Sequence, residues 1–394
     1  MYFYVQQVEI DQTSRRHDVI LDVATMADHV RLALVIGGPS QAVSKGNRAS
    51  MLRFSYMPSG YQGLKEGSWY DINPSAFVGA EYQPVDADAE GASFLRARLL
   101  GVPAENRFSQ FLTAPRVAAT SSPDTDLVVN PNPKGDVELT VVDCGHGNWN
   151  EITTTSDRVI YDVGASRWFT KAQVRDVVAA RRIENESRPT TVVVSHWDVD
   201  HYHALLEFRP NELAKLRVVF VPSQVPNTET FRRVFQLLKH SGVQVASLQP
   251  ASRSGGSREI VLEPHWQRGI FTMFRATPGR SRNQTGIALG IHGPREVALL
   301  TGDHHYEKVL SAATKMANYG RHPCVLVTPH HGGLAGEPSA TGWLAYFSRL
   351  TTPISCGANS YGHPNAGVEA ELTAMQAGVA PWRTDVNGTW TQVL

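Results

Sequence analysis

Ser195-His196-Trp197-Asp198-Val199-Asp200-His201 comes directly after residues 191–194, which read Thr-Val-Val-Val. A β-branched apolar run of this kind favours a strand buried on both faces of a sheet. Four imidazole and carboxylate groups within six residues then gather where that strand ends, and both groups are ligands for divalent metals. The segment therefore predicts a metal site at a strand end. The alternative is a solvated loop that contains His and Asp by chance.

Three further apolar runs downstream end in residues of the same type. Residues 297–303 end in Asp303, residues 325–331 end in the pair His330-His331, and residues 354–363 contain Asn359, Tyr361 and His363. In α/β folds, functional sites assemble at strand ends. Each run alone has an ordinary explanation, since Gly-Asp is a common turn and His-His-Gly occurs in loops. Together the runs predict one shared site.

The pattern after residue 136 alternates short apolar runs with helical periodicity, which predicts an α/β fold with many strands. Twelve of the 15 histidines fall in this part, between His196 and His363. We expect strands at 137–143, 158–163, 191–195, 217–221, 270–276, 285–291, 296–301, 324–328 and 353–356. We expect helices at 170–182, where Thr170 and Gln173 have capping-box spacing, and at 228–240, 306–317, 338–349 and 365–377.

The 394 residues suggest two domains, or one domain with an appendage. Pro, Ser, Thr, Asp and Asn cluster at 113–136, which predicts a linker between an N-terminal region (1–112) and a domain at 137–394. The N-terminal region contains strand-like runs at 19–21 and 30–36 and should be β-rich. It shows no recognisable chemistry, so binding of a protein partner, gating of the site and extension of the core all stay open.

Composition narrows the class of protein. The 37 Lys+Arg balance 37 Asp+Glu, which argues against a strongly basic nucleic-acid-binding protein, and 42% hydrophobic residues argue against a disordered chain. Three widely spaced cysteines without a CxxC pair predict neither a disulfide framework nor a thiolate zinc site. No signal peptide or membrane span is evident, so we expect a soluble, cytoplasmic protein.

Five motifs in order resemble the metallo-β-lactamase fold, and specifically its ComEC-type branch, the hydrolase domain of bacterial DNA-uptake proteins. The motifs are SHxDxDH (195–201), LLTGD (299–303), PHHGG (329–333), NSYGHP (359–364) and RTDxxG (383–388). The resemblance covers residues 137–394 and implies an αββα sandwich. The resemblance leaves residues 1–133 unexplained. The sequence shows no counterpart of the membrane channel that accompanies this domain in uptake proteins. The branch's DxGQGD opening reads Asp143-Cys-Gly-His-Gly-Asn148, so Asn148 should alter contacts near the substrate.

The resemblance also implies roles for individual residues. It implies that two divalent metals, Zn²⁺ with Mn²⁺ as the alternative, are held by His196, Asp198, Asp200, His201, Asp303 and His330. Asp200, Asp303 and His363 would take part in catalysis, with Asp303 bridging the metals. Asp162 would brace the ligand loop. The substrate or the ligands would be contacted by Asn283, His331, Asn359 and Tyr361. The roles of His304 and His305 stay open.

The resemblance also implies a phosphodiesterase or nuclease that acts on DNA or RNA, in which a two-metal site would activate a water molecule. Arg232, Arg233, Arg275, Arg280 and Arg282 could form a phosphate track, although they could equally be ordinary solvated residues. One alternative is a hydrolase of a small ester, lactone, lactam or phosphocholine, since a fold does not fix a substrate. Another is a non-catalytic regulatory module of the same fold.

Overall fold

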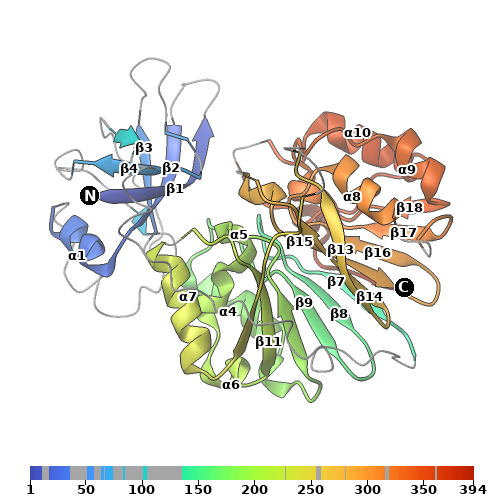
Figure 1. Cartoon of the computed structure of the whole chain (residues 1–394), viewed down its shortest axis with the longest axis horizontal. Coiled ribbons are helices and arrows are strands. Elements are labelled where there is room, and N and C mark those ends of the chain that lie inside the picture. The colour runs from blue at the N-terminus through green and yellow to red at the C-terminus, as the bar shows by residue number, and fades with distance from the viewer. Residues whose placement is uncertain are drawn as a thin grey trace.

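The strands of the chain form three sheets, shown in Figure 1. The structure is a computed structural model. It describes residues 1–10, 17–35, 51–56, 64–65, 67–73, 83–84, 101–103, 135–226, 228–253, 259–279, 281–315, 319–359 and 362–394. Within these ranges no helix is long and apolar enough to cross a bilayer.

One seven-stranded sheet has the order β12-β11-β10-β9-β8-β7-β19. Strands β9 to β12 run parallel, whereas β7, β8 and β19 pair antiparallel. The carboxyl ends of β9 and β10 therefore lie at the same edge of the sheet. The strands are β7 (Glu138–Val141), β8 (Asn150–Thr153), β9 (Arg158–Tyr161), β10 (Thr190–Val193), β11 (Leu216–Pro222), β12 (Gln244–Leu248) and β19 (Trp390–Val393).

A six-stranded sheet faces it, with the order β13-β14-β15-β16-β17-β18. Here β16, β17 and β18 run parallel, so the loops that follow β16 and β17 also lie together at one edge. The strands are β13 (Leu262–Arg268), β14 (Phe271–Ala276), β15 (Ile287–His292), β16 (Val297–Leu300), β17 (Pro323–Leu326) and β18 (Arg349–Thr351).

Three apolar clusters divide this part of the chain into four layers. Val192 and Val194 face a cluster shared with α4 and α7, whereas the intervening Val193 faces the cluster between the two sheets. A third cluster joins the second sheet to α8, α9 and α10. Alternate side chains of β10 are thus buried on opposite faces, which explains its continuous apolar sequence. The predicted α/β class and αββα sandwich are confirmed (Figure 1).

The predicted helices are confirmed, and their ends follow capping signals. Thr170 caps α4 with a complete capping box in which its side chain accepts from Gln173 N. Thr228 caps α7 with its side chain alone, which accepts from Phe231 N. The main helices are α4 (Lys171–Ala180), α7 (Glu229–His240), α8 (Tyr306–Thr314), α9 (Ala340–Tyr346) and α10 (Ala366–Met375). Short helices are α5 (Val199–Tyr202), α6 (Pro210–Leu213) and α11 (Thr384–Asn387).

The strand prediction for 353–356 is wrong, because this segment makes only an isolated bridge between Ile354 and Arg383. The expectation of a strand at 30–36 is also wrong, since α1 spans Met26–Val35. Thr25 Oγ accepts a hydrogen bond from Asp28 N at 3.1 Å, and this N-terminal cap favours a helix over the β-branched composition.

The N-terminal residues form a separate antiparallel sheet with the order β5-β3-β2-β1-β4-β6, so the predicted β-rich region is confirmed. The sheet has its own apolar cluster around Phe3, Val19 and Leu21. Its strands are β1 (Tyr2–Ile10), β2 (His17–Val23), β3 (Met51–Tyr56), β4 (Trp69–Ile72), β5 (Gln83–Pro84) and β6 (Gly101–Pro103). Except for residues 135 and 136, the predicted linker lies outside the described residues.

A buried ion cluster fixes β8 and should be needed for stability. Glu151 accepts from Arg158 Nη2 at 2.9 Å and from Arg181 Nη2 at 2.8 Å, and its side chain is 4% exposed. Burial raises the pKa of Glu151, but Arg181 and Arg158 outweigh burial and lower it. We expect Glu151→Gln to cost about 3 kcal/mol of unfolding free energy at pH 7, because the buried guanidinium of Arg158 and the partly buried one of Arg181 lose their carboxylate.

Denaturant unfolding at several pH values checks this prediction. The folded-state pKa of Glu151 is depressed, so its contribution is fully present above its unfolded pKa and is lost as pH falls through the folded pKa. The stability difference between wild type and Glu151→Gln should therefore shrink in acid. Glu138→Gln, an exposed change on neighbouring β7, is the control. Equal stability of wild type and Glu151→Gln at pH 7 would contradict the prediction.

Candidate metal centre

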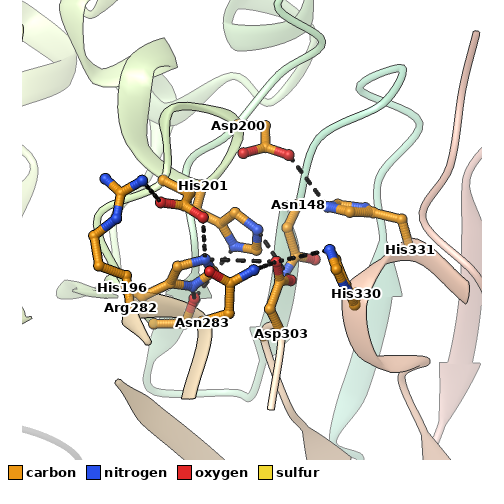
Figure 2. Close-up of polar contacts among 12 residues, drawn as sticks. Asn148, His196, Asp200, His201, Arg282, Asn283, Asp303, His330 and His331 are labelled. Carbon is orange, nitrogen blue, oxygen red and sulfur yellow. Dashed lines mark hydrogen bonds and ion pairs between the residues drawn. The ribbon is translucent and has the colours of Figure 1, made fainter. Parts of the chain in front are cut away.

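The loops that follow four parallel strands meet at one end of the sandwich. Ser195–His201 follows β10 and Asp162 follows β9, whereas Asp303 follows β16 and the pair His330-His331 follows β17. Figure 2 shows the cluster to which both sheets contribute, with the side chains of His196, Asp200, His201, Asp303, His330 and His331. The sequence prediction of one shared site at the strand ends therefore corresponds to a real cluster of side chains.

One group of ligand-type side chains consists of His196, His201 and Asp303, all buried, with one ligand atom of each within 4.8 Å of the others. His201 Nε2 lies 3.2 Å from Asp303 Oδ1, and His196 Nε2 lies 3.6 Å from Asp303 Oδ2. The two oxygens of one carboxylate thus face two different imidazoles. We call this set the first triad.

A second triad consists of His146, Asp200 and His331, whose ligand atoms also lie within 4.8 Å of one another. His331 Nε2 is 3.4 Å from Asp200 Oδ2, and the rings of His146 and His331 have centroids 4.5 Å apart. His331 Nδ1 donates to Ser355 O at 2.7 Å, which leaves Nε2 as the atom with a free lone pair toward Asp200. Two neighbouring triads suit two cations.

Asp162 braces the loop 195–201 through contacts with Ser195 and His201. It is fully buried and has the positive φ of 60° that only a constrained turn imposes on a non-glycine residue. Its carboxylate accepts from Ser195 N at 2.6 Å and Ser195 Oγ at 2.8 Å, and it lies 2.8 Å from His201 Nδ1. The Nδ1 contact turns His201 Nε2 toward the first triad.

Asn148 serves Asp162 rather than a substrate. Its Nδ2 donates to Asp162 Oδ2 at 2.8 Å, and its Oδ1 accepts from Asn150 Nδ2 at 2.8 Å. An aspartate at position 148 would place two buried carboxylates in contact, whereas the amide supplies a donor. The geometry thus gives Asn148 a role in positioning Asp162, and the expectation that it alters substrate contacts stays a prediction.

His330 and His331 share an unusual backbone, because both have left-handed conformations, with φ of 52° and 54°. Two consecutive non-glycine residues in this region cost about 1–3 kcal/mol each, and such strain clusters at functional sites. The turn directs His331 toward Asp200. It brings His330 Nε2 to 3.8 Å from Asp303 Oδ2, while the His330 side chain stays 32% exposed.

Asp198 lies between the first triad and an arginine. Its Oδ2 is 3.3 Å from His196 Nε2, and its Oδ1 is 2.8 Å from Arg282 Nη2. Burial raises the pKa of Asp198, but Arg282 and His196 outweigh burial and lower it. One oxygen is therefore held by a guanidinium, and the other faces the site of a metal ion.

Of the other predicted residues, Asn283, His363 and Asn359 lie at the edge of this cluster. Asn283 Nδ2 donates to Asp303 Oδ2 at 3.3 Å. His363 lies with its ring centroid 5.0 Å from that of His330, and Asn359 donates from Nδ2 to His363 O at 2.7 Å and accepts from His363 N at 3.0 Å. Asn359 thus shapes the loop that presents His363. Tyr361 lies outside the described residues.

The donor set fits divalent cations. His196 Nε2, His201 Nε2, His331 Nε2 and Asp303 Oδ1 are buried atoms without a hydrogen-bond partner, although they point toward one another. Buried polar atoms are almost always hydrogen-bonded, and bound metal is one explanation for exceptions. Three imidazole nitrogens with one carboxylate oxygen suit Zn²⁺, whereas a larger share of oxygen ligands suits Mn²⁺.

The electrostatics of the cluster also favour the binding of divalent cations. Burial and His201 lower the pKa of His196, but Asp198 and Asp303 outweigh them and raise it to about 9. Burial raises the pKa of Asp303, but His201, His330 and His196 hold it well below its ordinary value. Negative charge is thus concentrated at the first triad, which favours binding of a cation by the same atoms.

Two cavities open onto the cluster. One of about 240 Å³ is lined by residues of both triads together with Asn283, His330 and His363, and by Gln6 and Val8 of β1. A larger one of about 730 Å³ also reaches Asp303 and His330. Its other lining residues are Gly67, Ser68, Ser281, Arg282, Asn283, Gln284, His305 and Leu334.

Several residues to which the sequence assigned no role also lie at or near the cluster. His146 follows β7 and so obeys the strand-end rule that identified the other ligands, but its segment was read only for Asn148. His304 is buried, and His305 precedes α8 and accepts from Gln284 Nε2 at 2.8 Å. Gln6, Gly67 and Ser68 carry no local signal, because only the tertiary structure brings them to the cavities.

The suggested phosphate track does not form as a group. Arg232 and Arg233 lie on α7 and pair with Glu229, and Arg275 donates to Gln249 O at 3.0 Å. Arg280 lies outside the described residues. Of the arginines that the structure describes in this set, Arg282 lines the larger cavity.

Comparisons with known proteins concern the fold. No protein-family model and no curated protein matches the sequence. One similar solved structure is the metallo-β-lactamase fold protein YhfI from Bacillus subtilis, at 13% identity and a TM-score of 0.39, covering 66% of this chain and 100% of that chain. Tm1679, described as a metal-dependent hydrolase of the β-lactamase superfamily, has 12% identity and a TM-score of 0.35, covering 66% and 99%. The short form of human tRNase Z has 11% identity and a TM-score of 0.34, covering 56% and 93%.

Proposed function

We propose that the chain is a metal-dependent hydrolase of the metallo-β-lactamase fold, of the ComEC type, that cleaves phosphodiesters in DNA or RNA. The observation that supports this most is the pair of neighbouring His and Asp triads at one end of the sandwich. We place catalysis in residues 137–394. Zn²⁺ is the favoured ion, with Mn²⁺ as the alternative, because Asp198 adds a hard oxygen to the site.

Our proposed ligand set starts from His196, Asp198, Asp200, His201, Asp303 and His330, and the geometry adds His331 and His146. The chemistry that two divalent cations supply is activation of a water molecule and stabilisation of charge on the phosphoryl group. Asp200 and Asp303 accept a hydrogen bond from the attacking water and orient it. Asp162 fixes the tautomer of His201.

His363 acts from the wall of the smaller cavity. Burial, His330 and His331 lower its pKa to about 3, so its ring is neutral at pH 7. A neutral imidazole donates a hydrogen bond from one ring nitrogen, and that bond would stabilise charge on the leaving oxygen.

The larger cavity supports an anionic substrate. Arg282 supplies a cation, and Asn283 and Gln284 supply amide donors beside Asp303. Guanidinium and amide donors match the oxygens of a phosphate group. The phosphodiester therefore binds with its phosphorus near the triads and the rest of the substrate along this cavity.

A second candidate is a hydrolase of a small molecule, such as an ester, lactone, lactam or phosphocholine. The volume of the larger cavity, about 730 Å³, favours it, because small-ligand pockets span about 300–1,000 Å³. The two candidates share one metal site and differ only in what the cavity selects.

A substrate panel separates the two candidates. Purified protein loaded with Zn²⁺ or Mn²⁺ should cleave bis-p-nitrophenyl phosphate and single-stranded DNA or RNA, and EDTA should abolish the activity. Nitrocefin, a set of lactones and p-nitrophenyl phosphorylcholine test the second candidate. Metal-replete protein without phosphodiesterase activity would count against the first. Lack of any activity with metal bound would revive a regulatory role for the same fold.

A further inference from the structure

We propose that strand β1 of the N-terminal sheet is part of the active site. Tyr4 and Gln6 hold Arg282 against Asp198, and Gln6 also forms a wall that the substrate contacts. The first role concerns the metal centre alone, whereas the second rests on the proposed phosphodiesterase function. Both roles make the N-terminal sheet a determinant of activity and of substrate choice.

Arg282 connects the N-terminal sheet with the ligand loop. Its Nη2 lies 2.8 Å from Asp198 Oδ1, and its Nη1 donates to Trp197 O at 3.2 Å. The same Nη1 donates to Gln6 Oε1 at 3.4 Å, and the guanidinium carbon lies 4.8 Å from the centre of the Tyr4 ring. Two residues of β1 and two residues of the metal loop therefore hold one guanidinium.

An irregularity in β1 places the side chain of Gln6 beside Arg282. The pairing of β1 with β2 shifts register between Val5 and Gln7, so Gln6 is an extra residue without a partner on β2. Bulges of this kind redirect a side chain and occur beside active sites. The redirected amide is fixed from behind, because Gln6 Nε2 donates to Asp22 Oδ2 at 3.3 Å and both residues are buried.

The guanidinium of Arg282 stacks on the aromatic ring of Tyr4. The Tyr4 side chain is 4% exposed, so the ring is already desolvated and its position is set by the sheet. A guanidinium that stacks on a fixed aromatic ring loses much of its rotational freedom. Arg282 therefore meets Asp198 in one geometry, which leaves Asp198 Oδ2 directed toward His196.

The sheet is packed against the catalytic part, so the contacts are not isolated. Ile20 of β2 belongs to the same apolar cluster as Trp197 and Phe231. Arg233 Nη2 lies 3.4 Å from Met26 Sδ. These contacts place β1 over the triads, and Gln6 and Val8 line the smaller cavity beside Asp200 and His331.

The neighbouring loop extends the same wall. Gly67 N donates to Val5 O at 2.9 Å, and Val5 N donates to Ser68 O at 3.0 Å, so this loop is tied to β1. Gly67 and Ser68 line the larger cavity opposite Asn283 and Gln284. A substrate bound at the triads would therefore lie between the second sheet of the sandwich and the N-terminal sheet.

Variants of β1 test the proposal. Tyr4→Leu and Gln6→Ala should each lower kcat for bis-p-nitrophenyl phosphate about tenfold, the size expected for one contact to a charged group. Tyr4→Phe keeps the ring and should match wild type. Gln6→Ala should also raise KM for a single-stranded oligonucleotide more than for the small substrate. Arg31→Gln, an exposed change on α1, is the control.

A second readout does not depend on turnover. Co²⁺ bound in place of the native metal should show an altered visible absorption spectrum in Tyr4→Leu, because Asp198 is no longer oriented, and an unaltered one in Tyr4→Phe and Arg31→Gln. Thermal unfolding identifies variants that are merely unfolded.

The outcomes separate the two roles. Wild-type kinetics together with a wild-type Co²⁺ spectrum in Tyr4→Leu and Gln6→Ala would overturn the proposal, and so would an equal loss in Tyr4→Phe and Tyr4→Leu. If wild type cleaves no phosphodiester, the proposed function and the substrate wall fail, while the spectrum still decides whether β1 positions Asp198. A wild-type protein that binds no Co²⁺ would overturn the positioning role as well.

Discussion

Asp303→Ala should lower kcat by at least about 10³-fold and should deplete the bound metal, because several kcal/mol of charge stabilisation depend on the metal ions. Its oxygens lie 3.2 Å from His201 Nε2, 3.6 Å from His196 Nε2 and 3.8 Å from His330 Nε2. No other carboxylate among the described residues of the two triads faces histidines from both ligand loops. Loss of Asp303 therefore removes a proposed ligand that the surrounding imidazoles cannot replace.

Metal content and kinetics of the purified variant check this expectation. Asp303→Asn is the matched variant, since it keeps the shape and the contact with Asn283 but removes the negative charge. Both variants should fold, because the imidazoles around position 303 carry the positive charges that Asp303 now balances, and those imidazoles can lose their protons. Retention of full metal content together with wild-type kcat in Asp303→Ala would contradict the bridging role.

The candidate site could be predicted because it follows the geometry of parallel strands. Strands β10, β16 and β17 are apolar on both faces, so their sequences stand out, and polar residues directly after them must lie at one edge. The same logic applies to His146 after β7. The DxGQGD pattern gives no signal for His146, because the segment 143–148 departs from the metal-type residues of that pattern at Asn148.

Within residues 137–394, the strands that escaped prediction are mostly edge strands. Strands β12 and β19 lie at the two edges of one sheet, and β13 and β18 lie at the two edges of the other. An edge strand is buried less completely and need not be apolar, and β13 reads Leu-Glu-Pro-His-Trp-Gln-Arg. The internal strand β8 was missed for another reason, because it buries the polar pair Asn150 and Glu151 among ionic and amide partners.

The contacts of the N-terminal sheet with the candidate site could not be predicted from the sequence. Gln6 and Arg282 are 276 residues apart, and neither belongs to a motif that predicts a contact. The bulge that redirects Gln6 depends on the register of β1 against β2, which the sequence of β1 alone does not determine. Contacts of this kind become visible only when the sheets are packed.

The second triad is held together by Ser355, which links two loops that are far apart in the sequence. Ser355 O accepts from His331 Nδ1 at 2.7 Å, and Ser355 Oγ donates to Gly147 O at 2.7 Å, next to His146. The His146 loop is packed so tightly that a Cβ at Gly147 would lie 2.6 Å from the Ala165 backbone. His146 is therefore placed beside His331 by the fold before any ligand binds.

His146→Gln should consequently reduce the bound metal from about two ions per chain to about one, with the first triad still occupied. Glutamine keeps the polarity and much of the volume but lacks the imidazole nitrogen, so affinity at the second triad should fall at least about 10–100-fold, the range seen when a partner of a ligand is removed. kcat should fall with occupancy of that triad, and excess metal should restore part of it. His292→Gln, which changes a histidine packed on Tyr319 with ring centroids 4.2 Å apart, is the control and should keep both ions. If His146→Gln binds two ions as tightly as wild type, His146 is only a neighbour of His331, and the second ion must be held by Asp200 and His331 with other residues.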